Sequence, residues 1–214
     1  MARWDPGTEQ RLRKAALELF QEHGYDNVTV THIAERAGIT RRSYFRYFSD
    51  KREVLFANSD RLPTAVGEAV LAADKDTPPL TAVLDALAEV GVYLDKHGDG
   101  AAQRLEVINS SPELRERERT KLAALSAAID QAVRQRGLRP DLATSTAQLA
   151  TIAFANAYGR WVRANRQETF TDCLASAIAA LRGALGTVSW PTATAEPGGT
   201  AAHDPAPRAE STGS

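Results

Sequence analysis

The hydrophobic positions of this chain recur every three or four residues, which is the spacing of one face of a helix. The first such run begins at Thr8 and brings Leu12, Leu19 and Phe20 onto one side. Gly24 follows this run, and glycine readily takes the left-handed conformation that ends many helices. The pattern therefore predicts a first helix from about residue 8 to Gly24, which supplies the core of a small N-terminal domain.

Two short helices are predicted next, each with its own start signal. Thr29 and Thr40 are good N-caps, because a threonine hydroxyl accepts a hydrogen bond from an unpaired amide of the following turn. Gly38 lies between them and supplies the turn. The predicted helices cover about residues 30–37 and 41–48, and two capped helices joined by a glycine turn are typical of a helix-turn-helix.

The rest of the chain is predicted to be helical as well. A longer helix, capped by Ser49 or Asp50, should stop or kink at Pro63, because proline has no backbone donor. Asp141 is the expected cap of a later helix. The further predicted helices span about residues 80–97, 101–109, 112–136, 141–165 and 172–185. No run alternates as strands do, so the predicted fold class is all-α.

These elements divide the chain into three predicted parts. Residues 1–50 form a three-helix helix-turn-helix domain that starts at about residue 8. Residues 51–186 form a helical domain for ligand binding and dimerisation. Residues 187–214 are rich in Ala, Thr, Gly and Pro without periodicity, and this composition predicts disorder.

The charges concentrate on the second short helix. The chain carries a formal net charge of −1, but residues 40–52 hold five basic residues and one acid. A local basic patch on a neutral protein indicates a nucleic-acid contact. Cys173 is the single cysteine, which fits a reducing cytoplasm. No apolar run approaches the length of a transmembrane segment or a signal peptide, so we expect a cytoplasmic protein without a membrane partner.

The residues around the two caps are the predicted contacts to double-stranded DNA. Arg41 and Arg42 begin the second helix, where side chains reach base edges, and are expected to contact guanines. Hydroxyl, aromatic and cationic side chains should accompany them, mainly on phosphates. These further candidates are Thr29, Thr31, Thr40, Ser43, Tyr44, Phe45, Tyr47 and Lys51.

The segment AERAGITRRSYFRYFSDK, residues 34–51, resembles the TetR family of one-component transcriptional regulators. The resemblance covers roughly residues 10–56. Phe45 stands where the family often has Tyr, and Tyr47 where it often has His or Tyr. The resemblance implies a phosphate contact for Lys51. Residues 104–115, with R-x-x-V-I followed by P-E-L-R, resemble the subgroup with an acyl-CoA-like ligand-binding domain.

The last two predicted helices are candidates for self-association. Residues 147–159 are rich in Ala and end in Gly, which lets another helix approach closely. In proteins of this resemblance the last two helices form a four-helix bundle with a second subunit. The candidate interface residues are Leu149, Ile152, Leu174, Ile178 and Leu181. The alternative, that both faces are buried within one subunit, stays open on composition alone.

The middle helices are expected to enclose an apolar or amphipathic effector, and the subgroup resemblance implies an acyl-CoA-like one. The candidate walls are Val90, Tyr93, Leu125, Ile129, Phe154, Tyr158 and Trp161. Arg104 lies among apolar residues, and a guanidinium drawn there needs an anion or carbonyls to offset its desolvation. It is therefore the candidate partner of an anionic group. The alternative is that these large residues only fill the core.

The predicted function is a ligand-responsive regulator, most simply a repressor, that binds a palindromic operator as a homodimer. One alternative is an effector-independent architectural DNA-binding protein, and another is an all-helical enzyme. Against an enzyme, the chain has no Gly-rich phosphate loop, no HExxH, no GxSxG and no paired Cys or His cluster. No cofactor, metal or catalytic residue is expected. The charge run at residues 113–121 is interpreted as a solvated helix face.

Overall fold

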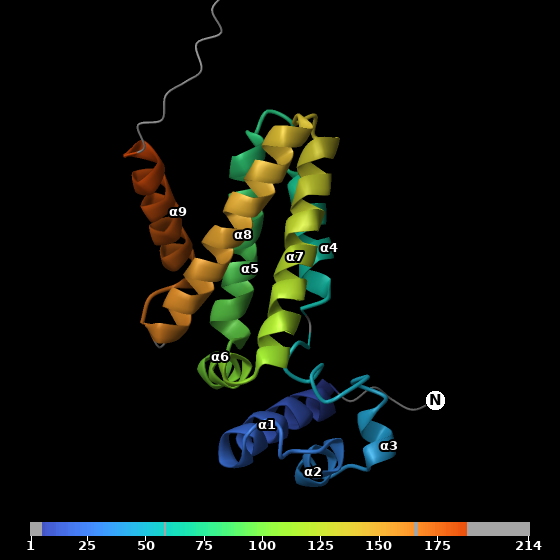
Figure 1. Ribbon diagram of the computed structural model, residues 1–214. Helices are drawn as coiled ribbons and strands as arrows, with labels where there is room; N and C mark the ends of the chain where they lie inside the picture. Colours follow the sequence, from blue (N-terminus) through green and yellow to red (C-terminus); the bar gives the residue numbers. More distant parts are fainter. Residues whose placement is uncertain (1–5, 58, 165–166, 188–214) are drawn as a thin grey trace, which may run out of the picture.

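The computed structural model describes residues 6–57, 59–164 and 167–187, and every regular element in these residues is a helix (Figure 1). The helices are α1 (Pro6–His23), α2 (Val30–Arg36), α3 (Arg41–Tyr44), α4 (Arg61–Ala72), α5 (Pro79–His97), α6 (Ala101–Ser110), α7 (Pro112–Gln135), α8 (Pro140–Arg163) and α9 (Phe170–Gly186). Figure 1 shows α1–α3 as a small head below the long helices of a body, α4–α9. The all-α prediction is confirmed. The tail predicted to be disordered lies, from residue 188 on, outside the described residues.

Local signals determine the ends of the head's helices as predicted. Gly24 follows α1 with a φ of 78°, and Gly38 follows α2 with a φ of 73°. The Thr29 hydroxyl accepts a hydrogen bond from the backbone N–H of His32 at 3.2 Å, while His32 Nδ1 accepts one from the N–H of Thr29 at 3.3 Å. Thr40 accepts a hydrogen bond from the N–H of Ser43 at 3.1 Å. Both predicted caps are present, and His32 completes the first as a capping box.

The second helix of the pair is shorter than predicted. Helix α3 covers only Arg41–Tyr44, whereas the prediction continued to Phe48. The N–H of Arg46 donates to the Ser43 carbonyl at 3.2 Å, and that of Tyr47 to the Tyr44 carbonyl at 2.9 Å. These bonds span three residues instead of four, so the chain tightens into turns after Tyr44.

The helix predicted between residue 50 and Pro63 is wrong. Residues 50–57 form turns, and α4 begins at Arg61. Val54, Leu55 and Phe56 are all buried, and three consecutive residues cannot share one face of a helix. Pro63 lies in the first turn of α4, where its missing N–H would have had no helical partner, so it neither stops nor kinks the helix. Helix α4 itself was not predicted beyond this proline.

The body packs its helices around an Ala-rich core. Helix α4 lies along α7 and α5, and α8 lies between α7 and α9. Asp95 ties three of them together, because it accepts hydrogen bonds from Trp161 Nε1 at 2.8 Å and from the N–H of Phe170 at 3.1 Å. Asp141 lies inside the first turn of α8 and Arg139 is its N-cap residue, which corrects the predicted cap. No helix in the described part of the chain is long and apolar enough to cross a membrane.

The link between head and body, residues 50–60, is held to the first half of α7 by charges. Arg52 lies 2.9 Å from Glu113, and Glu53 lies 2.6 Å from Arg117 and 3.7 Å from Lys121. Glu53 and Lys121 are only 13% and 12% exposed. The interpretation of residues 113–121 as a solvated face is therefore wrong for Lys121, while Glu113, Arg115, Glu116 and Arg119 are exposed as expected. Head and body also share one apolar cluster, which joins link residues Val54, Leu55 and Phe56 to Val107, Ile108 and Leu114.

Candidate nucleic-acid interface and internal cavity

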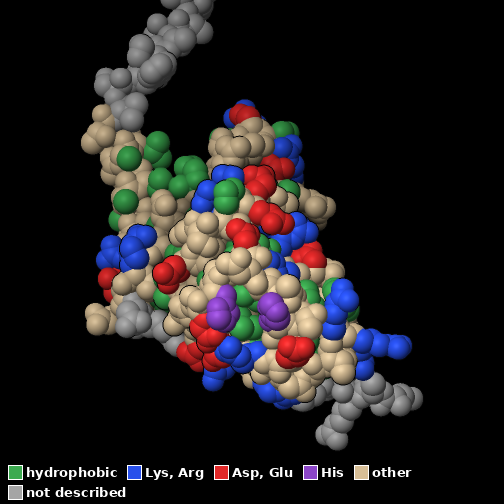
Figure 2. Space-filling view, turned by 60° about the horizontal axis from the view of Figure 1, so that its bottom comes forward, with side chains coloured by type: hydrophobic (Ala, Val, Ile, Leu, Met, Phe, Trp, Pro, Cys, Tyr) green, Lys and Arg blue, Asp and Glu red, His purple; other side chains and the backbone are tan. Residues whose placement is uncertain are grey.

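The start of α3 carries exposed cations on the outer side of the head. Arg41, Arg42 and Phe45 are all exposed. The guanidinium carbon of Arg41 lies 5.5 Å from the centre of the Phe45 ring, a cation–π contact that restricts the arginine. Figure 2, which brings the head forward, shows Lys and Arg side chains projecting from its α3 side. Arg41 is thus partly ordered, and Arg42 has no partner among the described residues, so both guanidinium groups are accessible to base edges or phosphates.

Hydroxyl groups surround these cations. Thr29, Thr31 and Thr40 are exposed, while Ser43 and Tyr47 are half-buried. The cap hydroxyls of Thr29 and Thr40 accept backbone hydrogen bonds, and the Thr40 hydroxyl also lies 3.0 Å from the Ser43 hydroxyl. A hydroxyl that accepts a hydrogen bond still has one O–H to donate. Both threonines lie at helix N-termini, where the backbone dipoles favour an anion. Their predicted phosphate contacts remain predictions.

Tyr44 corrects the predicted DNA-contact set. Its side chain is fully buried, and its hydroxyl donates to the backbone carbonyl of Asp50 at 3.0 Å. Burial raises the pKa of Tyr44. A neutral ring held in the core braces α3 against the link and cannot meet a phosphate. The helical spacing that placed Tyr44 beside Arg41 and Arg42 does not distinguish the inner face of so short a helix from the outer one.

Lys51 is more enclosed than a simple phosphate contact would be. Its Nζ donates to the Tyr25 carbonyl at 2.7 Å and lies 3.9 Å from the centre of the Tyr25 ring. Burial lowers the pKa of Lys51. An ammonium group has three donors, so the bond to Tyr25 leaves others for a phosphate. The predicted role stays a prediction, now with a fixed position for the amine.

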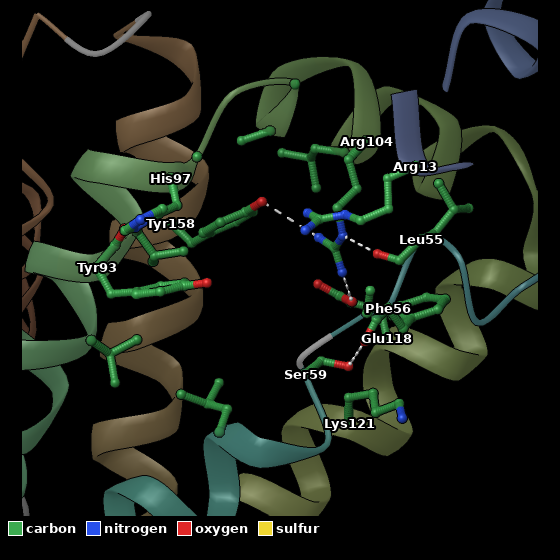
Figure 3. A pocket seen from close by; sticks show the side chains of 18 of the residues that line it. Arg13, Leu55, Phe56, Ser59, Tyr93, His97, Arg104, Glu118, Lys121 and Tyr158 are labelled. Carbon is green, nitrogen blue, oxygen red and sulfur yellow. Dashed lines mark hydrogen bonds and ion pairs between the residues drawn. The ribbon is translucent and has the colours of Figure 1, made fainter. Parts of the chain in front are cut away.

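A cavity of about 360 Å³ lies where the head, the link and the body meet (Figure 3). Residues from α1, the link, α4, α5, α6, α7 and α8 all line it. Five of the predicted wall residues line it, together with the predicted anion partner Arg104; the five are Val90, Tyr93, Leu125, Phe154 and Tyr158. The volume falls at the lower end of the range for small-molecule sites. The shape accommodates an organic molecule of moderate size.

Two predicted walls belong to the core instead. Ile129 and Trp161 are fully buried and do not line the cavity. Trp161 packs against Phe170 and donates its indole N–H to Asp95, which fixes α5, α8 and α9 to one another. Both residues share a helix face with true wall residues. Periodicity identifies that face, but the packing of the neighbouring helix determines which residues on it line the cavity and which are buried in the core.

Arg104 is the most connected side chain of the cavity, and it is 17% exposed. Its Nε donates to the Leu55 carbonyl at 2.6 Å, and its two terminal nitrogens donate to the Tyr158 hydroxyl at 3.4 Å and to Glu118 at 3.0 Å. Its guanidinium carbon lies 5.2 Å from the centre of the Phe56 ring. Burial opposes the charge of Arg104, but Tyr158 and Glu118 outweigh it and raise its pKa. Arg104 thus joins α6 to the link, α7 and α8 with a permanent positive charge.

The head contributes part of the cavity wall, which no pattern in the sequence predicted. Arg13 and Leu17 of α1 line it, together with the link residues Leu55 and Phe56. Arg13 stands one residue after Leu12 on a helix interpreted only as a core element, and no local pattern connects it to residues 90 positions later. The consecutive apolar residues Val54, Leu55 and Phe56 were an available signal, because such a run indicates an enclosed turn more than an amphipathic helix.

The outer side of α8 and α9 is apolar, and Figure 2 shows hydrophobic side chains gathered along this side of the molecule. Ile152 is 48% exposed, while Leu149, Ile178 and Leu181 are half-buried. Leu174 corrects the predicted interface, because it is only 4% exposed and packs within the subunit. The four others remain partly exposed on α8 and α9, and their place in a subunit interface stays a prediction.

Two family models match the chain. The model of the bacterial regulatory proteins of the tetR family matches residues 12–57, and the model of the MftR C-terminal domain matches residues 77–186. A curated relative, the putative mycofactocin biosynthesis transcriptional regulator MftR of Mycobacterium tuberculosis, is 26% identical over 174 residues. That match covers 80% of this chain and 87% of the relative.

Solved structures of regulators share the fold. NalD, the secondary repressor of a multidrug efflux pump in Pseudomonas aeruginosa, aligns with a TM-score of 0.59 and 19% identity, over 84% of this chain and 98% of that one. FadR of Bacillus subtilis in complex with stearoyl-CoA aligns with a TM-score of 0.56 and 18% identity, over 80% and 96%. The homologues and the fold are those of transcriptional regulators, not of enzymes.

Proposed function

Because the chain belongs to the TetR family of bacterial regulatory proteins, we propose that it is a homodimeric repressor whose operator binding is released by a small amphipathic effector. The observation that carries this proposal is the position of the cavity. Its walls come at once from the head, the link and the body. A ligand in the cavity contacts the head, which carries the proposed DNA-binding surface, so ligand binding and the position of the head are physically connected.

The head is proposed to contact the major groove through the start of α3. Arg41 and Arg42 contact guanines, with Phe45 ordering Arg41, and each lost bidentate contact costs about 1–3 kcal/mol. Phosphates are held by the cap hydroxyls and by Lys51. The remaining phosphate candidates are Thr31, Ser43 and Tyr47.

The dimer is proposed to form through the apolar side of α8 and α9, around Leu149, Ile152, Ile178 and Leu181. A two-fold dimer places two heads on successive major grooves, which is why such regulators bind palindromes. Charged residues in place of Ile178 and Leu181 should give monomers with weak operator affinity. Monomers of the unaltered protein in sedimentation at micromolar concentration would exclude this assembly.

The effector is proposed to act by population shift. A ligand releases the operator only if it binds the released arrangement of the heads more tightly than the DNA-bound one. A tenfold change requires about 1.4 kcal/mol of differential binding. The stearoyl-CoA bound by Bacillus subtilis FadR makes acyl chains reasonable first candidates. A cavity of about 360 Å³ would take the acyl part and leave a bulky nucleotide outside.

The test begins with an operator selected from random duplex DNA, followed by fluorescence anisotropy. Arg42→Ala should lower affinity and relax sequence preference, while Arg139→Ala, an exposed arginine at the start of α8, should change neither. Effector affinity is then measured with and without operator. A true inducer must bind the DNA-bound dimer less tightly, because linkage is reciprocal. Equal affinities would favour the alternative of an effector-independent architectural protein.

A further inference from the structure

Arg13 is a cation in the wall of the cavity without a partner among the residues that the structure describes. It comes from α1 and is half-buried. Within residues 6–57, 59–164 and 167–187 no hydrogen bond or ion pair engages its guanidinium. The other two strong bases of the cavity wall have acidic partners, since Arg104 pairs with Glu118 and Lys121 pairs with Glu53 and Asp60. A half-buried guanidinium without a partner loses hydration and gains nothing in return.

In Figure 3 the Arg13 side chain extends from α1 toward the side of the cavity where Arg104 lies. A guanidinium has five N–H donors, and the three hydrogen bonds that Arg104 makes to Leu55, Tyr158 and Glu118 leave two of them available. Two arginines at one end of a cavity match the planar oxygens of a carboxylate or the oxygens of a phosphate. Aliphatic and aromatic side chains form much of the remaining wall, namely Leu62, Val90, Leu94, Leu122, Leu125 and Phe154.

We infer that the cavity holds the anionic end of an amphiphile between Arg13 of the head and Arg104 of the body, with its apolar part among α4, α5, α7 and α8. This inference rests on the proposed function. It adds that the effector carries an acidic group and that this group binds between the two arginines. The anion supplies the partner that Arg13 lacks. It also shares Arg104 with Glu118 and the Leu55 carbonyl, so the ligand acts on the link itself.

Because Arg13 belongs to the head and Arg104 to the body, a ligand bound to both connects the two across the joint, the region where the head, the link and the body meet. Arg13 moves with α1, the helix on which α2 packs. Arg104 moves with α6 and is bonded to α7 and α8. An anion bound to both favours the head orientation that brings the two guanidinium groups to bonding distance of it. The acidic group thus determines which head orientation the ligand favours. The apolar part contributes affinity but does not favour one head orientation.

The test compares three probes of equal chain length by titration calorimetry in low salt: decanoate, decyl phosphate and 1-decanol. The unaltered protein should bind at least one of the two anions about tenfold more tightly than the alcohol. The preferred anion distinguishes a carboxylate from a phosphate source. Arg13→Gln should remove most of this preference and weaken operator release by the anion. Arg13→Lys, which keeps the charge, should retain part of both.

Lys14→Gln is the matched control. Lys14 follows Arg13 on α1, its side chain is 80% exposed, and it pairs only loosely with Glu18 at 4.0 Å. This variant loses the same charge but should behave as the unaltered protein. Circular dichroism checks that all variants are folded. Equal anion preference in Arg13→Gln and Lys14→Gln would overturn the inference.

Two other outcomes separate this inference from the proposed function. If the alcohol and the anions bind equally well and all release the operator, the anion site is wrong while the effector-controlled repressor stands. If none of the probes binds, the amphipathic effector and the anion site are both wrong. The anion site and the proposed function are both supported if the anion preference disappears in Arg13→Gln, persists in Lys14→Gln and is accompanied by operator release.

Discussion

The two ends of the body each hold a positively charged arginine against backbone carbonyls, but they do so differently. At the far end from the head, Arg136 donates to the carbonyls of Val70 and Ala73 at 3.2 and 2.8 Å and to those of Asp74 and Thr77 at 2.6 and 2.9 Å. At the joint, Arg104 donates to only one carbonyl and otherwise to the side chains of α7 and α8.

The difference separates a fixed connection from an adjustable one. Four backbone carbonyls around Arg136 close the C-terminus of α4 and the turn to α5, and none of them can leave without unfolding that turn. The partners of Arg104 are mostly rotatable side chains beside a cavity. The link is held by ion pairs of the same exchangeable kind. We conclude that the far end holds the body's shape and that the joint can change.

The largest effect is expected when the fixed connection at Arg136 is broken. Arg136→Ala leaves four carbonyls of the α4–α5 turn without their shared donor and should lower the free energy of unfolding by about 3 kcal/mol. Urea denaturation measures this loss. Arg139→Ala is the control and should stay within about 0.5 kcal/mol. Arg139 is exposed, and among the described residues its one ion pair is with the exposed Asp141. Equal losses for the two variants would contradict the fixed role of Arg136.

A smaller effect is expected at the joint. Glu53→Gln removes the acid that Arg117 and Lys121 share and should cost about 1–2 kcal/mol, between the values for exposed and buried ion pairs. Hydrogen exchange should quicken in α1–α3 more than in α8. Glu116→Gln, which breaks the exposed pair with Arg119 on the same helix as Arg117, should leave exchange unchanged. Uniformly faster exchange would mean that the link stabilises the whole chain and not the head's docking.

The head could be predicted closely from the sequence because its structure depends on neighbours in the chain. The caps at Thr29 and Thr40 and the turn at Gly38 need only residues within one helical turn. The error at Tyr44 arose because a four-residue helix shows too little periodicity to orient its ring, and the other predicted contacts stay predictions. Because these caps and this turn depend on residues close in the sequence, the sequence was sufficient to predict them.

The joint could not be predicted in the same way, because its contacts join distant residues. Glu53 meets Arg117 across 64 positions, and Arg104 meets Leu55 across 49. The pattern around Pro63 favoured a helix over the link, since Val54, Leu55 and Leu62 fit its period. For the cavity, periodicity found the right helix faces but could not separate Tyr158, on the wall, from Trp161, in the core. Which positions meet empty space is set by packing between helices.

The smallest effect tests whether charge or capping holds the link. Asp50 Oδ1 accepts hydrogen bonds from the N–H groups of Arg52 and Glu53 at 2.8 and 3.1 Å, and Oδ2 lies 2.8 Å from the Arg52 guanidinium. The hydrogen bond from the Arg52 side chain, opposed by partial burial, lowers the pKa of Asp50. A carboxylate whose folded pKa is lowered stabilises the protein above its unfolded pKa of about 4, and this contribution is lost as the pH falls through the lower folded value.

Asp50→Asn keeps a capping oxygen but removes the charge. At pH 7 it should lower the free energy of unfolding by up to about 1 kcal/mol. The difference from the unaltered protein should shrink as the pH falls below about 4 and disappear below the lowered folded pKa, where Asp50 is neutral in both states. Asp50→Ala removes the cap as well, so it should keep a deficit of about 1 kcal/mol even in acid. Urea midpoints at pH 7, 5 and 3 measure both. If the Asn variant differed from the unaltered protein equally at every pH, the charge of Asp50 would have no part in holding the link, and its backbone acceptor role alone would explain the turn.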